Sequence, residues 1–565
     1  MNTNDLEAKL KERQRVTDDL LKEPLDPRHY LTRARLYLEL GYPDLATGDA
    51  HKALELVETG LDDAYSDYPP EVWNEESSSF IPFGIEENEE ELSSLRVSCF
   101  LLLSECCSLL KCFQDALHFF KRAEELDEHP QFSPRVKQAK QTFLRQYSAA
   151  NPSEIAGSVL VNNRTDLRNM GGARREIYPW NDHEPDRSSP EVLHFLNERL
   201  QDVAPVLEAK TIALPVLHSS DEGDDNADTN NVSIQFGLVA KQDLPPGTRI
   251  LHEPSLLNAC RTLHAPLCDC CQSPLPPLSS KTPPVSCSSC SDVVFCSQAC
   301  FDLAQCKYHP AICDNEEDLE EIGRDVQSLT PSEDLYLLLL ARVVAMAETQ
   351  DIHPLDLPEI KYIWGDFSTS ETPTTLPFTF NHTVNLPHRV LTAMSISPFS
   401  TTSLIRYDTW IFQTLYAKFR GVASAKQSTW DGKPEVAAVH PLWCLANHSC
   451  DPNIRWEWPA PALSNADSGV ADSTSAQPDG VGDTPHDRVG SGIVMAVRTK
   501  NERASWTGKE GREEDWHGIK AGEEILNHYC DIRLPVKERR EWALGALGGL
   551  CMCHRCKWEA DQEKA

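Results

Sequence analysis

The sequence lacks both a long apolar run and an apolar segment near its first residues. We read no stretch of it as approaching the roughly 20 consecutive apolar residues that a membrane-spanning helix needs. Residues 1–7 read MNTNDLE and contain no apolar core of the kind found in a secretory signal. These absences predict an intracellular protein, in the nucleus and/or the cytoplasm, without a membrane partner.

Positive charge is also scarce. The chain has 53 Lys and Arg residues against 87 Asp and Glu residues, which gives a formal net charge of −34. Such a field disfavours binding to nucleic-acid phosphates, so we expect no direct nucleic-acid partner. It attracts a basic protein substrate such as a lysine-rich tail, although acidity that only aids solubility explains the same composition. With 565 residues the chain is too long for one core, and its length predicts about three or four domains.

Cysteine, in contrast, is abundant, with 20 residues. Without a secretory signal, a disulfide framework is disfavoured. More than half of the cysteines stand at metal-ligand spacings, which suit a reducing compartment. Four pairs supply enough ligands for two closed tetrahedral sites, and the spacing alone leaves interleaved and sequential pairing open. These pairs are Cys268 with Cys271, Cys287 with Cys290, Cys296 with Cys300, and His309 with Cys313. A further group, Cys551, Cys553 and Cys556, needs a fourth ligand from elsewhere.

Residues 447–453 read NHSCDPN and follow an apolar run. Their side chains offer hydrogen-bond donors and acceptors and one thiol, and Pro452 ends any helix, so they predict a turn crowded with polar groups. Downstream, residues 522–529 read GEEILNHY. Upstream, residues 234–240 alternate like a strand, and a turn at residues 245–247 precedes a second apolar segment.

This ordered set of motifs resembles the SET-domain protein lysine methyltransferases, in the branch that carries a MYND zinc module inside the SET domain. The resemblance covers roughly residues 231–558. It implies an α+β multidomain protein, in which N-terminal α-helical repeats precede a β-rich SET domain. A MYND zinc module and a helical insertion interrupt that domain, and a zinc-binding post-SET segment closes it.

Two N-terminal segments resemble tetratricopeptide repeats, because small or aromatic residues recur where two antiparallel helices would approach each other. The first set is Ala34, Tyr37, Ala46, Ala50 and Ala53, and the second is Ser104, Cys107, Ala116, Phe120 and Ala123. A plain helical bundle is the alternative. Stacked helix pairs form surfaces for protein partners, so we expect partners at the repeats and at the MYND module.

The expected domain boundaries follow from changes in composition and from the resemblance. The order is helical repeats at 1–135, a partly disordered linker at 136–230, the first part of the SET domain at 231–265, the MYND module at 266–314, a helical insertion at 315–440, the catalytic core at 441–535, and the post-SET segment at 536–565. Residues near 459–492 and 500–517 are predicted to be disordered insertions in the core.

The resemblance also implies the ligands of three zinc ions. Two ions belong to the MYND module, where the pairs interleave: Cys268, Cys271, Cys296 and Cys300 bind one, and Cys287, Cys290, His309 and Cys313 bind the other. The third ion belongs to the post-SET segment, where Cys450 from the polar turn joins Cys551, Cys553 and Cys556. That last link would tie the C-terminal segment to the active site.

The implied reaction is methyl transfer from S-adenosylmethionine to a lysine amine of a protein substrate, histone or non-histone. The amine must be neutral, and no covalent enzyme intermediate is needed, so positioning carries most of the catalysis. By resemblance Tyr529 is the catalytic residue and also contacts the cofactor. The other implied cofactor contacts are Gly237, Leu238, Asn447 and His448. We expect Glu523 and Glu524 on a solvated face.

A second hypothesis is an inactive adaptor that binds protein partners. Gln235 stands where the family has a glycine in its first cofactor loop, and residues 546–550 lack the aromatic residues usual before the last cysteines. Methylation of a small molecule is a third, weaker hypothesis. An intact NHSCDPN turn and Tyr529 favour the enzyme.

Overall fold

The computed structural model describes helices and strands in an α+β arrangement. The described residues are 3–62, 71–74, 79–82, 89–126, 133–152, 167–186, 189–215, 217, 232–260, 267–290, 293–324, 335–363, 365, 367, 375–427, 434–458, 492–506, 516–547 and 549–564. The predicted disordered stretch at 459–492 lies outside them except for its last residue, whereas only residues 507–515 of the stretch at 500–517 do, and residues 500–502 form a helical turn.

The chain forms two compact units, and each contains segments that are distant in sequence. Unit 1 comprises residues 1–178, 324–329 and 373–414, and unit 2 comprises residues 179–323, 330–372 and 415–565. The sequence suggested a single helical insertion at 315–440. Residues 373–414 of that stretch group with the N-terminal helices in unit 1.

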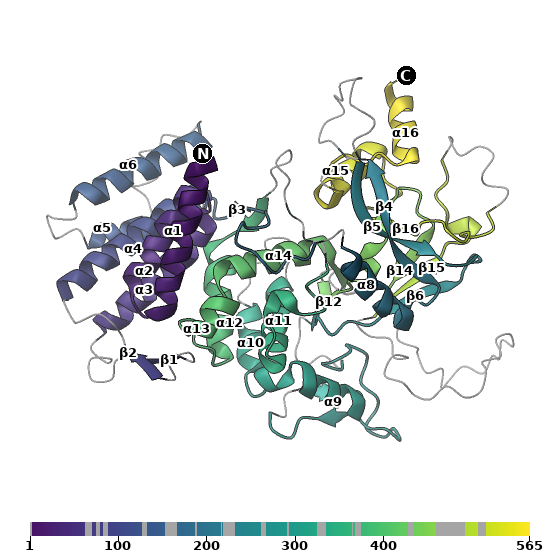
Figure 1. The fold of residues 1–565 in the computed structure, drawn as a ribbon, viewed down its shortest axis with the longest axis horizontal. Coiled ribbons are helices and arrows are strands. Elements are labelled where there is room, and N and C mark those ends of the chain that lie inside the picture. The colour runs from purple at the N-terminus through teal and green to yellow at the C-terminus, as the bar shows by residue number, and fades with distance from the viewer. Residues whose placement is uncertain are drawn as a thin grey trace. The chain divides into compact units, whose positions relative to one another are not determined.

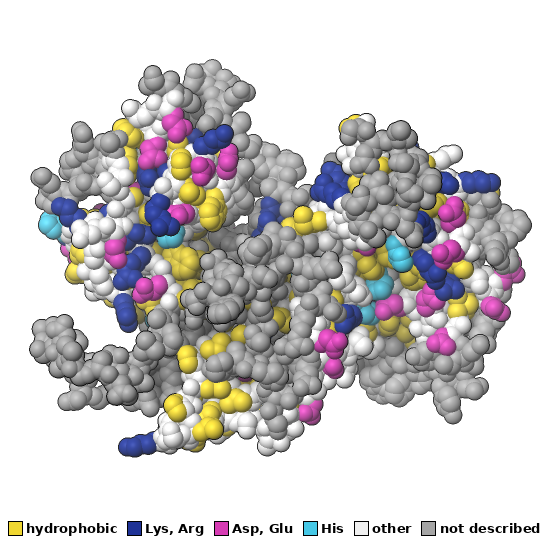
Figure 2. All heavy atoms as spheres, turned by 180° about the vertical axis from the view of Figure 1, so that it is seen from behind, with side chains coloured by type: hydrophobic (Ala, Val, Ile, Leu, Met, Phe, Trp, Pro, Cys, Tyr) yellow, Lys and Arg dark blue, Asp and Glu magenta, His cyan; other side chains and the backbone are white. Residues whose placement is uncertain are grey.

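Unit 1 is mainly helical (Figure 1). Its helices are α1 (Thr3–Lys22), α2 (Pro27–Leu40), α3 (Pro43–Leu61), α4 (Glu89–Leu109), α5 (Phe113–Glu125), α6 (Ser133–Ala150), η4 (Asn381–Asn385), α12 (Leu386–Ala393) and α13 (Thr401–Arg406). Two antiparallel strand pairs accompany them: β1 (Glu71–Asn74) with β2 (Ser79–Pro82), and β3 (Gly171–Arg174) with β10 (Thr375–Phe378). On the face drawn in Figure 2, acidic and basic side chains are interspersed.

Local signals explain the α2–α3 pair. The Asp26 side chain caps α2 by accepting a hydrogen bond from the backbone N–H of Arg28, and Pro27 occupies the first turn. Gly41 ends the helix with φ of 86°, a left-handed conformation that glycine adopts without strain. The residues predicted at the helix contacts are all buried, including Ala34, Ala46 and Ala50 at 0% exposure.

Helix α4 is long and apolar enough to cross a membrane by length and composition, a feature that we did not read from the sequence. In the structure 67% of its apolar window is buried within the protein, and core helices of soluble proteins meet the same criterion. Its buried residues include Leu102, Leu103 and Cys106. The helix is therefore weak evidence for a membrane span.

Unit 2 contains most of the strands. An antiparallel pair joins β4 (Leu207–Pro215) to β5 (Val232–Ala240). One three-stranded sheet has the order β14 (Ile454–Glu457), β15 (Ile493–Val497) and β6 (Arg249–Glu253), and a second has the order β11 (Ala423–Gln427), β12 (Pro434–Val439) and β7 (Asn258–Cys260). Two short pairs complete the set: β8 (Val285–Ser286) with β9 (Val294–Phe295), and β13 (Asn447–His448) with β16 (Leu526–Asn527).

Unit 2 also contains helices within its described residues. They are α8 (Pro190–Val203), α9 (Gln298–Lys307), η2 (His309–Ala311), α10 (Glu316–Arg324), α11 (Tyr336–Gln350), η3 (Pro354–Asp356), η5 (Trp443–Leu445), η7 (Lys500–Glu502), α15 (Val536–Leu547) and α16 (His554–Lys564). Helix α14 (Thr409–Val422) begins in residues of unit 1 and continues in residues of unit 2.

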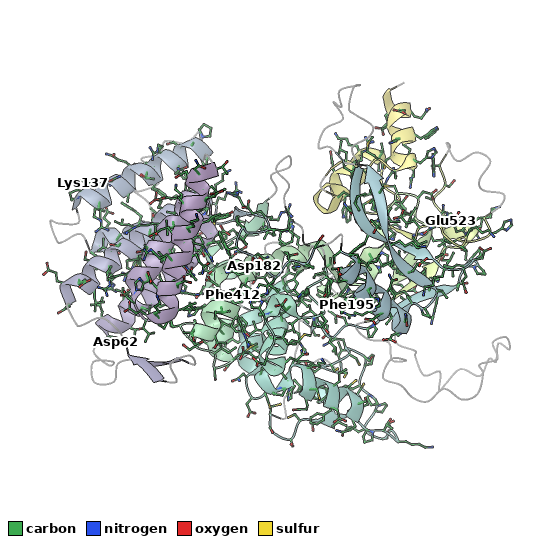
Figure 3. All side chains as sticks on the ribbon, viewed as in Figure 1. Asp62, Lys137, Asp182, Phe195, Phe412 and Glu523 are labelled. Atoms are coloured by element: carbon green, nitrogen blue, oxygen red, sulfur yellow. The ribbon has the colours of Figure 1, made fainter. Side chains whose placement is uncertain are left out.

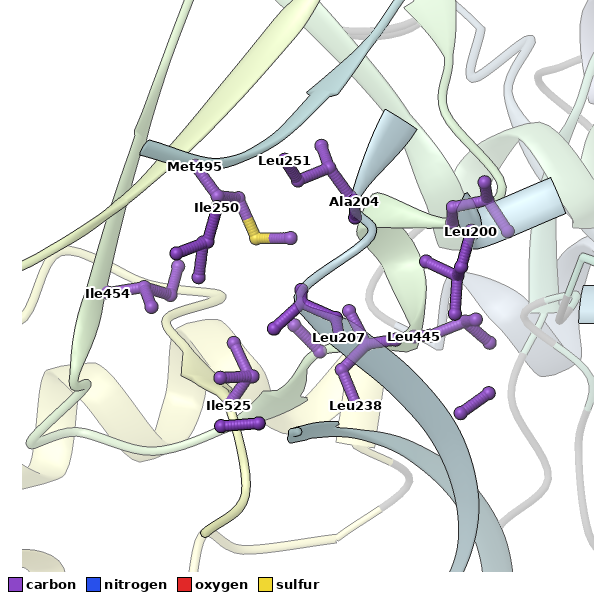
Figure 4. Close-up of a cluster of buried hydrophobic side chains, with 14 of the residues drawn as sticks. Leu200, Ala204, Leu207, Leu238, Ile250, Leu251, Leu445, Ile454, Met495 and Ile525 are labelled. Carbon is purple, nitrogen blue, oxygen red and sulfur yellow. The ribbon is translucent and has the colours of Figure 1, made fainter. Parts of the chain in front are cut away.

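One apolar core supports the polar turn of unit 2. Leu200 from α8, Leu238 from β5 and Met495 from β15 meet there (Figure 4). Leu445, two residues before β13, and Ile525, immediately before β16, belong to the same cluster and are 5% and 0% exposed. Burying a side chain of this size contributes roughly 1.5–3 kcal/mol. The apolar residues thus fix the chain just before the residues that carry polar groups.

Candidate functional site

The polar turn is held against residues 526–529 by a short parallel strand pair. Asn447 pairs with Leu526, and His448 pairs with Asn527. Beyond the strands, the backbone N–H of Ser449 donates to the carbonyl of Asn527 at 2.7 Å. The side chain of Asn453 accepts from the N–H of Leu526 at 2.7 Å and donates to the carbonyl of Glu524 at 2.8 Å. Two segments more than 70 residues apart therefore form one rigid site.

Asn447 connects this site to strand β5. Its Nδ2 donates to Glu524 Oε1 at 2.7 Å and to the carbonyl oxygen of Phe236 at 3.4 Å. A Cβ atom on Gly237 would lie 2.8 Å from Asn447 Nδ2, so the strand approaches this closely only because residue 237 is glycine. Leu238 points into the apolar core and is 0% exposed. Gly237 thus lies at the site, whereas Leu238 belongs to the apolar core on which the site rests.

The sequence suggested that Glu524 lies on a solvated face. In the structure it is instead the hydrogen-bond partner of Asn447. Burial raises the pKa of its carboxyl group, and the hydrogen bond from Asn447 opposes that rise. The neighbouring Glu523 is exposed, as expected, and lies at the surface in Figure 3. The difference arises because consecutive residues of an extended chain point to opposite faces.

His448 lies between Tyr529 and Cys450. The backbone N–H of Tyr529 donates to His448 Nδ1 at 3.0 Å, which makes Nδ1 an acceptor. Burial lowers the pKa of the imidazole to about 4, so the ring is neutral at neutral pH. Its single proton is therefore on Nε2, which lies 3.3 Å from Cys450 Sγ. The ring joins the backbone of Tyr529 to a thiol of the four-cysteine group.

Tyr529 places its hydroxyl close to the polar turn. The hydroxyl donates to the carbonyl oxygen of Ala446 at 3.1 Å. Burial raises the pKa of the phenol well above its usual value, so the group keeps its proton at neutral pH. Its ring centroid lies 5.2 Å from that of His448.

Aromatic side chains line the same region. Trp456 contacts both Trp443, at a centroid distance of 5.1 Å, and His528, at 6.0 Å in a stacked geometry. Burial, with a smaller contribution from Arg498, lowers the pKa of His528 to about 4. The indole Nε1 atoms of Trp443 and Trp456 are buried, and no group in the described part of the chain accepts a hydrogen bond from either. Buried donors of this kind favour a bound molecule with acceptor atoms.

The four-cysteine group adjoins His448. Cys450 Sγ lies 3.9 Å from Cys551 Sγ and 3.3 Å from Cys556 Sγ, and Cys553 completes the group. Zinc–sulfur bonds of about 2.3 Å in a tetrahedron place sulfurs about 3.8 Å apart, so the geometry fits one ion. Arg555 holds the segments together by donating to the carbonyl of Cys450 at 2.9 Å.

The cysteine-rich module contains two more groups that are able to bind metal ions, in the interleaved arrangement. Cys268, Cys271, Cys296 and Cys300 form the first group, and Cys287, Cys290, His309 and Cys313 form the second. The sulfurs of Cys296 and Cys300 lie 3.6 Å apart, and those of Cys287 and Cys313 lie 3.9 Å apart. The distances again suit tetrahedral coordination.

The module is anchored to α11 through a buried cation. The Arg342 guanidinium lies 3.7 Å from the ring centroid of Tyr308 and donates to Asp269 at 3.2 Å. Tyr308 also donates to Asp269 at 2.6 Å. Asp269 directly follows Cys268, and Tyr308 directly precedes His309, so these contacts position the backbone beside two metal-binding residues.

Sequence reasoning did not identify Cys530. Its sulfur forms a group of three possible ligand atoms with the Cys450 sulfur and a ring nitrogen of His448. This group adjoins the four-cysteine group through Cys450. Its position directly after Tyr529 was the available signal. The spacing rules did not include it because it has no cysteine at a two- to four-residue interval.

A separate group consists of His183, His353 and Asp356. His183 Nδ1 lies 2.8 Å from Asp356, and the two imidazole rings stack at a centroid distance of 3.7 Å and an angle of 3°. One ion cannot lie in the planes of two parallel rings at this separation. We therefore do not include this group in the site.

A scan against protein-family models found no match to this chain. A search of curated proteins also found no significant match.

Proposed function

We propose that this protein is an S-adenosylmethionine-dependent methyltransferase that acts on the side-chain amine of lysine in a basic protein substrate. The observation that carries the proposal is the convergence of Asn447, His448 and Tyr529 at one half-buried site that is joined to a four-cysteine group through Cys450. The resemblance to SET–MYND enzymes supplies the reaction. Zinc is the proposed ion in all three groups, because thiolate and imidazole ligands in tetrahedral sites suit it.

Asn447, His448 and Tyr529, with Gly237 beside them, would hold the cofactor. The buried indole donors of Trp443 and Trp456 fit a molecule that carries carboxylate or amide acceptors. S-adenosylmethionine supplies a methyl group on a sulfonium centre. A lysine nitrogen would form the new bond to that carbon as the carbon–sulfur bond breaks, with the electron pair of that bond left on sulfur.

The residues of the chain position this reaction and do not form covalent bonds in it. A lysine amine has an ordinary pKa of about 10.4, so it must lose a proton before it attacks. Tyr529 is a poor base because burial keeps its phenol protonated. Its hydroxyl and the Ala446 carbonyl can instead orient the amine, while the surrounding aromatic rings exclude water and favour the neutral form.

The four-cysteine ion would act through His448 as a support. The imidazole donates toward Cys450 Sγ and accepts from the backbone N–H of Tyr529. A metal ion that holds the Cys450 sulfur in place would therefore orient the imidazole ring, and the ring in turn would position Tyr529. The proposed location remains intracellular, in the nucleus and/or the cytoplasm. Protein partners are proposed at the MYND module and at surfaces of the repeat helices.

One observation favours the adaptor as the second candidate. Asn447 and Tyr529 already satisfy their hydrogen bonds within the chain, to Glu524 and to the Ala446 carbonyl. A site that needs no ligand to satisfy these groups is also what a SET fold without activity would have.

Calorimetric binding of S-adenosylmethionine to zinc-replete protein separates the two candidates. We expect micromolar binding by the wild type, none by Asn447→Ala, and near wild-type binding by Tyr529→Phe. Transfer of labelled methyl to a lysine-rich protein should then occur with the wild type and fall at least about a hundredfold with Tyr529→Phe, as for other lost transition-state contacts. Folded wild type that binds no cofactor would overturn the enzyme proposal and leave the adaptor.

A further inference from the structure

Four charged side chains are buried together in unit 1. Arg33 donates from Nε and NH2 to the two carboxylate oxygens of Asp49, both at 2.7 Å. Arg33 NH1 also lies 3.1 Å from Asp408 Oδ2, and Lys52 Nζ lies 3.6 Å from Asp408 Oδ1. The four side chains are 1–8% exposed.

Three of these charges come from α2 and α3, and only Asp408 comes from a distant part of the chain. Asp49 balances only one of the two cations Arg33 and Lys52, and both cations contact Asp408, at 3.1 and 3.6 Å, so these three groups carry one surplus positive charge. A buried cation without a counter-charge is costly, so the helices present a position that requires one carboxylate. Asp408 supplies it.

Residues that precede Asp408 in the chain contact the same helices and α5. Phe380 contacts the rings of His51 on α3 and Phe119 on α5, at 5.2 and 5.0 Å. His388 Nε2 lies 2.9 Å from Glu55 on α3. Phe399 contacts Tyr30 on α2 edge to face, at 6.1 Å.

The fit leaves no space beside Asp408. A Cβ atom on Gly48 of α3 would lie 2.1 Å from Thr409 Oγ1, so a side chain there would displace the segment. Figure 1 draws α12 and α13 next to α3, and η4 packs on α3. We call residues 378–409 the docked segment.

We propose that the surface of α2, α3 and α5 is a binding site for a segment that presents one carboxylate and several aromatic rings, and that its ligand is the docked segment of the same chain. Arg33 and Lys52 recognise the carboxylate, and His51, Phe119 and Tyr30 receive the aromatic rings. A separate protein therefore reaches this surface only by displacing Asp408. The proposal stands whether or not the protein is a methyltransferase.

Hydrogen–deuterium exchange on the full-length protein tests the docking. Asp408→Asn keeps the shape of the side chain and removes its charge, and we expect amides of 381–393 to exchange at least about tenfold faster. Glu12→Gln, an exposed carboxylate paired with Arg15 in the same unit, is the matched control and should leave them unchanged. Unchanged exchange in Asp408→Asn would overturn the proposal.

A double variant distinguishes charge recognition from general loss of packing. Lys52→Met with Asp408→Asn removes one cation together with one carboxylate and leaves Arg33 balanced by Asp49, so exchange should return toward wild type. This variant also keeps the test valid if Asp408→Asn alone does not fold. A double variant that exchanges as fast as Asp408→Asn, or faster, would show that the carboxylate is not recognised by Lys52.

A fluorescent peptide of residues 397–412 tests the site itself. It should bind the Asp408→Asn protein at least about tenfold more tightly than the wild type, whose site is filled. The same peptide with Asn at 408 should bind that protein more weakly. Equal binding of the two peptides, or equal binding to both proteins, would contradict an occupied carboxylate site.

Discussion

The buried carboxyl group of Glu253 should make the stability of unit 2 depend on pH. Glu253 ends strand β6 and is 3% exposed. Its two oxygens accept from the backbone N–H groups of Leu442 and Trp443 at 3.0 and 2.7 Å, which holds the chain at the start of η5, just before the polar turn. Burial outweighs these hydrogen bonds and raises the pKa of the carboxyl group to about 7.

The direction of the effect follows from proton binding. The unfolded chain loses this proton near pH 4.5, whereas the folded chain keeps it up to about pH 7. Between these values the folded state binds more protons, so the free energy of unfolding falls as pH rises and levels off above pH 7. Each tenfold change in the acid constant is worth about 1.4 kcal/mol, which gives a total of about 3 kcal/mol.

Glu253→Gln removes this dependence and exposes its size. The amide oxygen can accept from only one of the two N–H groups, so the variant loses about 1–3 kcal/mol at every pH. At pH 5 we therefore expect the variant to be less stable than the wild type. By pH 8 its relative stability should have improved by about 2–3 kcal/mol, so that it equals or exceeds the wild type.

Urea unfolding of zinc-replete protein, followed by tryptophan fluorescence at pH 5 and pH 8, measures both differences. Glu457→Gln is the control, because Glu457 is an exposed glutamate of the neighbouring strand β14 and should show no such change. A stability difference between wild type and Glu253→Gln that stays constant within about 0.5 kcal/mol would refute the reasoning, since the carboxyl group would then titrate alike in both states.

Three further outcomes are expected. Metal analysis should find three zinc ions in each chain, and Cys553→Ser should remove one of them while the two ions of the cysteine-rich module stay bound. Gly237→Ala should destabilise unit 2 by about 1–3 kcal/mol in urea and weaken cofactor binding, because its methyl group would lie 2.8 Å from Asn447 Nδ2. His448→Ala should leave the Tyr529 N–H without its acceptor and lower stability by about 1–3 kcal/mol, measured likewise, with zinc still bound.

Spacing in the sequence predicted the metal groups well because each ligand pair is local. A two- or three-residue interval, such as that from Cys287 to Cys290, places both sulfurs on one turn whatever the rest of the fold does. The mixed helix and strand content was predicted for a similar reason. The interleaved pairing needed the resemblance, because local spacing does not state which pairs meet.

Distant contacts between charged groups were not predictable in this way. Asp408 is 375 residues from Arg33, and no periodic pattern joins them. The environment of Glu524 was predicted wrongly because two adjacent glutamates are indistinguishable in a sequence, although only Glu523 is exposed. The grouping of residues 373–414 with the N-terminal helices likewise depends on which surfaces match, which a hydrophobic pattern does not encode.

The site itself has little secondary structure to hold it, since β13 and β16 contain two residues each and η5 contains three. Its order must therefore come from what lies on its two sides. On one side Leu445 and Ile525 fix the chain in the apolar core. On the other side Cys450 holds it only if the sulfurs of four separate cysteines stay together, and four neighbouring thiolates repel each other without a cation. A metal ion at this group thus acts on the geometry of His448 and Tyr529 as well as on the stability of the C-terminal segment.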